Sequence, residues 1–374
     1  MLTFRFLNVD HGASVLIEFE HAGSRFFGLI DSNCNFGSVP KALSYLRNLN
    51  ANGLSFLALT HPHNDHFSGL YTIMVEFRGK IKEFYSFPLG NFIENAPRRA
   101  KLKKQLSSLF ARTDSESLRH ARLELLQILR WAQENHNAGL TIWQECDGEL
   151  NTLAPEGFAG VEFSTILPPK SAKAHWLEKI DKGELDRPGA VNENDLSIAL
   201  SLKYCGIEVI VGGDGTKVNW ESKRRFEIRR GAAFGAPIVN LPHHGSRLDC
   251  DSDVLEFLFC KNGDRFGISS ADGNSHPAPE TINWLSDHGI APYCTNLISL
   301  CGANVMNLPV SPGLNRELAR WIQEVSNKAH RIQVCQGDIT LTISDRGAVT
   351  IGTETGVPCG FRGEYSKILN PKGA

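Results

Sequence analysis

The feature that most constrains the fold of this chain is a run of metal-ligand side chains that follows directly on an apolar segment. Residues 54–59 are mostly apolar over the length of a strand, and residues 67–75 have the pattern of a helix. Between these two segments lie His61, His63, Asp65 and His66. The pattern predicts a strand that leads into a tight turn, with a helix that begins inside the cluster.

This spacing offers ligands to two neighbouring metal ions. His61 and His63 are two residues apart on extended backbone, so both side chains can point to the same side. Asp65 and His66 stand at the start of the helix and can face a second point. Imidazole and carboxylate ligands together suit zinc, manganese or iron. The alternative, a polar surface turn, is disfavoured because such a motif in a strand-turn-helix context is rarely accidental.

Composition bounds the class of protein without naming a substrate. The 374 residues, 41% of them hydrophobic, can bury one large core or two modest ones. A net charge of -2 neither demands nor excludes a nucleic-acid partner. The 9 cysteines contain no C-x-x-C pair, which predicts reduced thiols. No signal-peptide pattern and no apolar run of membrane-spanning length is found, so we expect a cytoplasmic protein without membrane contact.

The rest of the sequence alternates between predicted strands and helices. We interpret residues 94–136, which are partly basic and helical in character, as a helical insertion. Residues 296–331 are interpreted as a C-terminal insertion with a helix. Residues 168–193 are rich in Pro, Lys and Glu and are expected to form an irregular loop near the site. Residues 353–374 have the character of a tail, which leaves residues 1–352 as one domain.

Two later strand ends carry further candidate ligands. Residues 208–215 predict a strand that ends in glycines and Asp214, and glycines let the backbone approach a ligand closely. Taken alone, Asp214 is one strand-end aspartate among several. Residues 237–241 predict a strand that delivers His243 and His244 to a turn ending in glycine. Because this pair arrives in the same manner as the first cluster, we interpret it as a second metal signal.

Two other features are weaker signals. Asp31 ends a predicted strand before a loop, where its carboxylate could orient a ligand histidine from the second shell or could simply serve as a turn or capping residue. A basic helix over residues 219–230 begins a few residues after Asp214. Its Arg224 and Arg225 are candidates to contact a phosphate-bearing substrate, although most charge runs are solvated helix faces.

These motifs resemble the metallo-β-lactamase-fold hydrolases, whose signature is His-x-His-x-Asp-His after a strand. The chain is most similar to the hydrolase domains attached to ComEC competence proteins and to their stand-alone soluble relatives. Departures from the family's V-G-Q-G-D-S opening are Asp10 and His11 in place of Gly-Gln, and Ala13 in place of Asp. The resemblance implies an α/β fold, the αββα sandwich. The other matching stretches are residues 29–31, 194–202, 213–214, 242–246 and 274–277.

The resemblance also implies a role for each matching residue. His243 would face substrate while His244 completes the second metal site, or the two roles would be exchanged. Many family members have another histidine ligand before the bridging aspartate, and here water or Asp195 would take its place. Further substrate-binding candidates on matching turns are Ser246 and Asn274. The implied metal ligands are His61 and His63 for one ion, Asp65, His66 and His244 for the other, and Asp214 as the bridge.

The implied chemistry is hydrolysis by a metal-bound hydroxide. Two ions about 3.5–4 Å apart lower the pKa of a bridging water and clamp the oxygens of a phosphate. Asp65 would orient the hydroxide while it holds its metal. His276 would donate a hydrogen bond or a proton to the phosphate or the leaving oxygen. Alternatively, His276 is a loop histidine that packs beside Pro277.

We therefore predict an enzyme, a phosphodiesterase or nuclease that uses two divalent ions, Zn²⁺ or Mn²⁺, and acts on nucleic acid or a nucleotide. A second hypothesis is a hydrolase of a small ester, lactone, thioester or phosphocholine-type substrate, which the same core could support. A third is a non-catalytic or partner-regulated binding module. The sequence leaves open the true substrate, the native metal, the oligomeric state and any protein partner.

Overall fold

The computed structural model describes most of the chain. Its description omits residues 36, 91, 93–94, 112–115, 149–151, 185–191, 273–274, 297–336 and 357–374.

Two mixed sheets form the centre of the molecule. The first has eight strands in the order β15-β14-β1-β2-β3-β4-β5-β6, and the second has seven in the order β13-β12-β11-β10-β9-β8-β7. The strands of the first sheet are β1 (Leu2–Phe6), β2 (Val15–His21), β3 (Ser24–Ile30), β4 (Leu54–Leu59), β5 (Ile81–Ser86), β6 (Ile142–Glu145), β14 (Ile339–Ile343) and β15 (Val349–Thr353). Those of the second are β7 (Thr152–Leu153), β8 (Val161–Leu167), β9 (Ala199–Tyr204), β10 (Ile207–Val211), β11 (Ile238–Asn240), β12 (Phe266–Ser269) and β13 (Ala291–Cys294).

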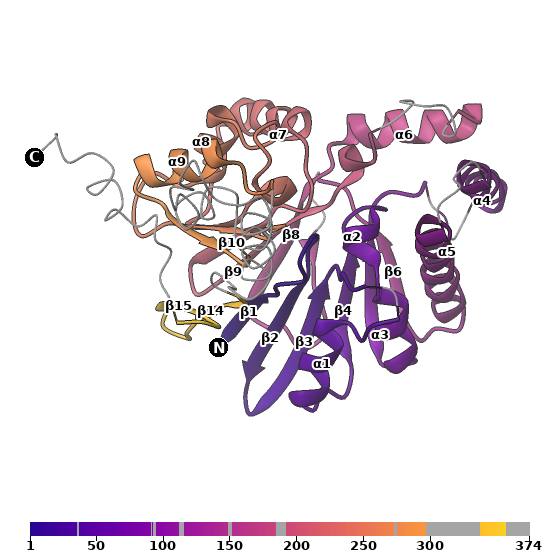
Figure 1. Cartoon of the computed structure of the whole chain (residues 1–374), viewed down its shortest axis with the longest axis horizontal. Helices are drawn as coiled ribbons and strands as arrows, with labels where there is room; N and C mark the ends of the chain where they lie inside the picture. Colours follow the sequence, from indigo (N-terminus) through magenta and orange to yellow (C-terminus); the bar gives the residue numbers. More distant parts are fainter. Residues whose placement is uncertain are drawn as a thin grey trace, which may run out of the picture.

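Helices cover the outer faces of both sheets. Figure 1 shows α1, α3 and α5 beside the first sheet and α7, α8 and α9 beside the second. The predicted αββα sandwich is confirmed. The helices are α1 (Lys41–Asn48), α2 (Asn64–Phe67), α3 (Leu70–Glu76), α4 (Ala96–Ala111), α5 (Glu116–Asn137), α6 (Lys170–Lys182), α7 (Lys217–Arg230), α8 (Ser252–Leu258) and α9 (Pro279–Asp287), with short 3-10 turns η1 (Glu193–Leu196) and η2 (Pro242–Gly245).

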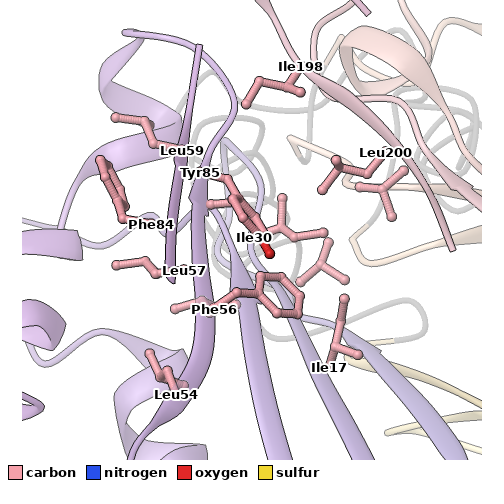
Figure 2. Packing of buried hydrophobic residues seen from close by; sticks show 14 of the residues in the cluster. Ile17, Ile30, Leu54, Phe56, Leu57, Leu59, Phe84, Tyr85, Ile198 and Leu200 are labelled. Carbon is pink, nitrogen blue, oxygen red and sulfur yellow. The ribbon is translucent and has the colours of Figure 1, made fainter. Parts of the chain in front are cut away.

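Strand β4 is buried on both faces, which explains its nearly continuous apolar sequence, interrupted only by Ser55. It pairs in parallel with β3 and β5, and a parallel strand covered on both sides favours apolar residues at almost every position. Figure 2 shows Phe56 on the side that faces the second sheet, together with Tyr85, while Leu57 and Leu59 lie on the opposite side. Gly28 on β3 leaves room for this ring, because a Cβ there would lie 2.0 Å from Phe56 Cε1.

Segments outside the two sheets agree only partly with expectation. The predicted loop over residues 168–193 is wrong, because α6 occupies residues 170–182. Trp176 and Ile180 are buried on this helix, and their spacing of four residues is a helical stripe that the high content of charged residues obscured. Helices α4 and α5 occupy most of residues 94–136, where a helical insertion was predicted.

The predicted C-terminal insertion and tail fall almost wholly outside the described residues. Of residues 296–331 the structure describes Asn296, and of residues 353–374 it describes 353–356. Among the described helices, none is both long enough and apolar enough to cross a membrane.

Candidate metal centre

The cluster predicted from the sequence lies where strands from both sheets end. His61 follows the end of β4, and His63 is the residue that precedes α2. Asp214 follows β10 after two glycines, and η2 carries His243 and His244 after β11. Two sheets that pack face to face bring their strand ends to a common edge, so residues more than a hundred positions apart in sequence meet there.

Six of the predicted side chains form two groups of ligand atoms. In each group the atoms that could bind a metal all lie within 4.8 Å of one another. The first group is His61, His63 and Asp214, and the second is Asp65, His66 and His244.

Asp214 lies between the two groups. Its Oδ2 is 3.6 Å from His61 Nε2 in the first group. Its Oδ1 is 3.2 Å from His66 Nε2 and 3.6 Å from His244 Nε2 in the second group. The two oxygens of one carboxylate therefore face different groups, as a bridging ligand requires.

The backbone at Asp214 is shaped to present this carboxylate. The Asp214 amide donates a hydrogen bond to Ser197 Oγ over 2.8 Å. Gly213 has a φ of 51°, and a Cβ there would stand 2.6 Å from Ile198 O and from Ser197 Oγ. A side chain at residue 213 would therefore clash with the segment that holds Asp214 in place. The strand-end glycine noted in the sequence is needed for this close approach.

The second group has the separations expected of ligands around one ion. Tetrahedral bonds of about 2.0–2.2 Å place ligand atoms about 3.3–3.6 Å apart. His66 Nε2 and His244 Nε2 are 3.3 Å apart, and they lie 3.7 and 3.5 Å from Asp65 Oδ2. Two imidazole nitrogens that face each other at this distance gain little from direct contact, whereas a divalent ion between them would satisfy both.

Buried atoms without hydrogen-bond partners support the same conclusion. His61 Nε2 and Asp214 Oδ1 are buried and have no hydrogen-bond partner among the described residues. A buried polar atom left in this state is costly unless a bound species satisfies it. Both atoms face the ligand atoms of the two groups, so the residues present fit a divalent metal ion.

The protonation of the histidines follows from their surroundings. Burial, together with the nearby His66, lowers the pKa of His61 well below its usual value, which favours the neutral ring that a metal requires. Burial also disfavours the charged form of His66, but Asp214 and Asp31 outweigh it and raise its pKa well above the usual value. Negative charge that holds a proton here would equally attract a metal cation.

Asp31 lies behind the centre and orients one of its histidines. His66 Nδ1 donates to Asp31 Oδ2 over 2.7 Å, which leaves His66 Nε2 directed at the ligand group. Asp31 is held in turn by the Thr60 amide at 2.8 Å and the Thr60 hydroxyl at 2.6 Å. Its φ of 57° is unusual for a residue other than glycine, and such strain is typical of functional positions. Of the two sequence interpretations of Asp31, the structure favours orientation of a ligand histidine.

The structure separates the roles of the two adjacent histidines. His244 belongs to the second ligand group, whereas His243 belongs to neither. His243 Nδ1 donates to Asp249 Oδ2 over 2.6 Å, and its Nε2 lies 3.8 Å from Asp214 Oδ2. Both histidines have positive φ, 45° and 55°, which is unusual for residues other than glycine. The centroids of the His276 and His243 rings lie 5.9 Å apart, so His276 is next to the candidate metal centre.

The remaining sequence candidates lie elsewhere. Asp195 accepts a hydrogen bond from the Thr216 hydroxyl over 2.7 Å and is in neither ligand group. Ser246 supports the turn itself, since its amide donates to His243 O. Arg224 and Arg225 pair with Asp253 and Glu221 at 3.6 and 3.9 Å. Asn274 is outside the described residues.

Two further residues that sequence reasoning did not assign lie at the centre. His11 Nε2 is 3.2 Å from Asp65 Oδ2, and Glu193 Oε2 is 3.9 Å from His63 Nε2. The available signal for His11 was its place in the opening motif, where it departs from the family pattern. Glu193 stands directly before the matching stretch that begins at residue 194. Within that stretch Asp195 was the predicted acidic candidate.

A cleft opens beside the second ligand group. It has a volume of about 770 Å³ and runs from the centre along the loop before α1 toward α5. His11 and Asp65 line its inner end, and His120 and Gln127 line the part formed by α5. A substrate in this cleft would have direct access to the second group.

Three solved structures match this chain at low sequence identity and low TM-score. A mutant of the CmlA beta-hydroxylase covers 79% of this chain at 12% identity and a TM-score of 0.40, while this chain spans 52% of that protein. A diphosphatase from the PhnP family has 12% identity and a TM-score of 0.35, covering 72% of this chain and 87% of its own. Zn²⁺-bound PqqB from Methylobacterium extorquens has 12% identity and a TM-score of 0.38, covering 79% and 97%. The sequence matches no family model and no curated protein.

Proposed function

We propose that this chain is a metal-dependent hydrolase of phosphodiesters that holds two divalent ions, Zn²⁺ or Mn²⁺. The observation that carries the proposal is the position of Asp214, whose two carboxylate oxygens face separate ligand groups. One ion alone would not need a carboxylate shared in this way. The imidazole ligands suit zinc and the carboxylates suit manganese, whereas calcium and magnesium are usually bound by oxygen ligands alone.

The ligands divide between two sites. His61 and His63 would hold the first ion, and Asp214 would be shared with the second. Bound ions would activate a water molecule at neutral pH and stabilise the charge that builds on a phosphate during displacement. The other ligands of the second ion would be Asp65, His66 and His244.

Residues around the two sites would position the substrate. The bond between His243 Nδ1 and Asp249 fixes the ring, so that Nε2 is directed toward Asp214. Burial lowers the pKa of His243, but Asp249 and Asp214 outweigh burial and raise the pKa, and the protonated ring could donate from Nε2 to a substrate oxygen. His276 lies beside this ring and can contact the same region. The cleft next to Asp65 would receive the rest of the substrate, with His11 at its inner end.

The first prediction tests this activity directly. Purified protein supplied with Mn²⁺ or Zn²⁺ is expected to hydrolyse bis(p-nitrophenyl) phosphate, to lose this activity after chelation and to regain it when metal is returned. Turnover of a lactone or carboxyl ester in its place would favour the small-ester hypothesis. Metal binding without turnover of any of these compounds would favour a binding module.

Nucleic acid is the proposed natural phosphodiester because two basic helices flank the centre. Figure 1 shows α7 and α4 on opposite sides of α2, the helix that carries Asp65 and His66. Part of the charge on these helices is already paired, since Arg98 on α4 binds Asp181 at 2.6 Å and Arg224 faces Asp253. The pairs of Arg224 and Arg225 are exposed and long, at 3.6 and 3.9 Å, so both arginines would exchange these partners for phosphates beyond the scissile one.

The second prediction separates a polymeric substrate from a small one. Changing Arg224 and Arg225 together to Glu is expected to weaken nucleic-acid binding and to reduce its salt dependence, by about one log unit per log unit of salt for each phosphate that the variant no longer binds. Hydrolysis of bis(p-nitrophenyl) phosphate should change little, because neither side chain belongs to a ligand group.

A matched control makes this measurement specific. Lys80 and Lys82 flank the start of β5, at the opposite end of that strand from the centre, and their joint change to Glu alters net charge equally. Binding measured against salt concentration should remain unchanged in this control. If the Arg224 and Arg225 variant binds nucleic acid normally but loses small-substrate activity, the two arginines are structural and the polymeric substrate loses its support.

A further inference from the structure

The two ligand groups are unequal. Asp65, His66 and His244 would supply three ligands to a second ion, and Asp214 Oδ1 would add a fourth. Among the residues that the structure describes, Asp214 alone joins His61 and His63 in the first ligand group. An equal division of ligands between two ions would therefore need a fourth protein ligand at the first site.

Two acidic residues lie on the turn that passes this position. Glu193 and Asp195 both belong to η1, directly before β9. Asp195 is engaged on the far side, where it accepts from the Thr216 hydroxyl and its carbonyl accepts from Asn219. Glu193 turns the other way, and its Oε2 lies 3.9 Å from His63 Nε2.

The backbone of this turn is fixed to the two strand ends that carry the ligands. The Ile198 amide donates to the Thr60 carbonyl over 3.0 Å, which joins the end of the turn to the end of β4. Ser197 Oγ accepts from the Asp214 amide. Asn192 begins the turn and accepts from the Asn194 amide. Glu193 is therefore held at the edge of the first ligand group by contacts that do not involve its own side chain.

We propose that the Glu193 carboxylate is the fourth protein ligand of the ion held by His61, His63 and Asp214. The separation of 3.9 Å from His63 Nε2 is close to the 3.5 and 3.7 Å found within the second group. The Glu193 side chain is 41% exposed, so it closes the first site on its solvent side and can adjust its position. This inference rests on the proposed metal-dependent function.

Metal titration of the apo-protein tests this role without reference to turnover. Wild-type protein is expected to bind two Zn²⁺ per chain in competition with a chromophoric chelator. Glu193→Gln removes the charge and keeps the shape of the side chain. It should lower the affinity for one of the two ions by at least about 100-fold, since loss of even an indirect partner of a ligand lowers metal affinity 10–100-fold. The other ion should bind as in the wild type.

Two further variants identify the cause. Asp195→Asn changes a neighbouring carboxylate that points away from the centre, and both ions should bind normally. Glu193→His offers an imidazole at the same place and should restore the affinity for the ion that Glu193→Gln binds weakly. In the Co²⁺-substituted protein, the visible absorption of one site should change in Glu193→Gln and remain unchanged in Asp195→Asn.

The outcomes separate this inference from the function on which it rests. If wild-type protein binds two ions and Glu193→Gln binds both with unchanged affinity, Glu193 is no ligand while the metal-dependent function stands. If Asp195→Asn weakens the first ion and Glu193→Gln does not, the assignment of the two acids is reversed. If wild-type protein binds no divalent metal, both the function and the role of Glu193 are overturned.

Discussion

Replacing Asp214 by asparagine is expected to lower kcat for a phosphodiester by at least about 1,000-fold, at the upper end of what one electrostatic group contributes to catalysis. An amide offers one oxygen where the carboxylate offers two, so one of the two ligand groups is left without an oxygen from residue 214. The ligand group that loses this oxygen keeps two or three protein ligands and has less negative charge. Measurement of kcat with bis(p-nitrophenyl) phosphate, together with metal content, would show this loss.

The variant should remain folded, because the strands that carry the centre are held by the core and not by the ligands. Circular dichroism and the unfolding midpoint would report this. Asp253→Asn is the matched control, since Asp253 lies on α8 and pairs with Arg224 outside both ligand groups. If Asp214→Asn keeps wild-type turnover and wild-type metal content, Asp214 is not a ligand shared by two ions, and the main support for two ions is lost.

Phe56→Ala is expected to lower the free energy of unfolding by about 3–5 kcal/mol, as truncation of a buried aromatic side chain does. Phe56 is fully buried between the sheets, and its ring centre lies 5.6 Å from those of Tyr85 and Phe158 and 5.5 Å from that of Phe163. Contacts with both sheets cannot all be replaced when the ring is removed (Figure 2), so a cavity remains. Urea denaturation would measure the loss.

An exposed apolar residue provides the comparison. Ile228 on α7 is 67% exposed, and Ile228→Ala should change the free energy of unfolding by less than about 0.5 kcal/mol. If Phe56→Ala were equally mild, the two sheets would not depend on this ring for their packing. The predicted difference between the two variants therefore tests the sandwich core.

Local sequence patterns predicted the elements that carry the centre. The apolar run of β4 and the start of α2 were recognisable because their side-chain periods arise from residues adjacent in sequence. The same patterns placed Asp214 and the pair His243 and His244 at strand ends. These signals are local, and they remained valid once the chain folded. For α6 the local pattern was present but was outweighed by its charged residues, so that helix was missed.

Which side chain faces the centre at each turn depends on contacts between distant parts of the chain. His243 and His244 are neighbours with the same chemistry, and contacts with Asp249 on one side and with the second ligand group on the other give them different places. Glu193 and Asp195 are separated in the same way, because Thr216 holds Asp195 away from the centre. Local patterns alone were enough to predict that histidines and carboxylates would gather at strand ends. Their division into two groups, with Asp214 between them, required the packing of one sheet against the other, because those distances are set by residues far apart in the chain.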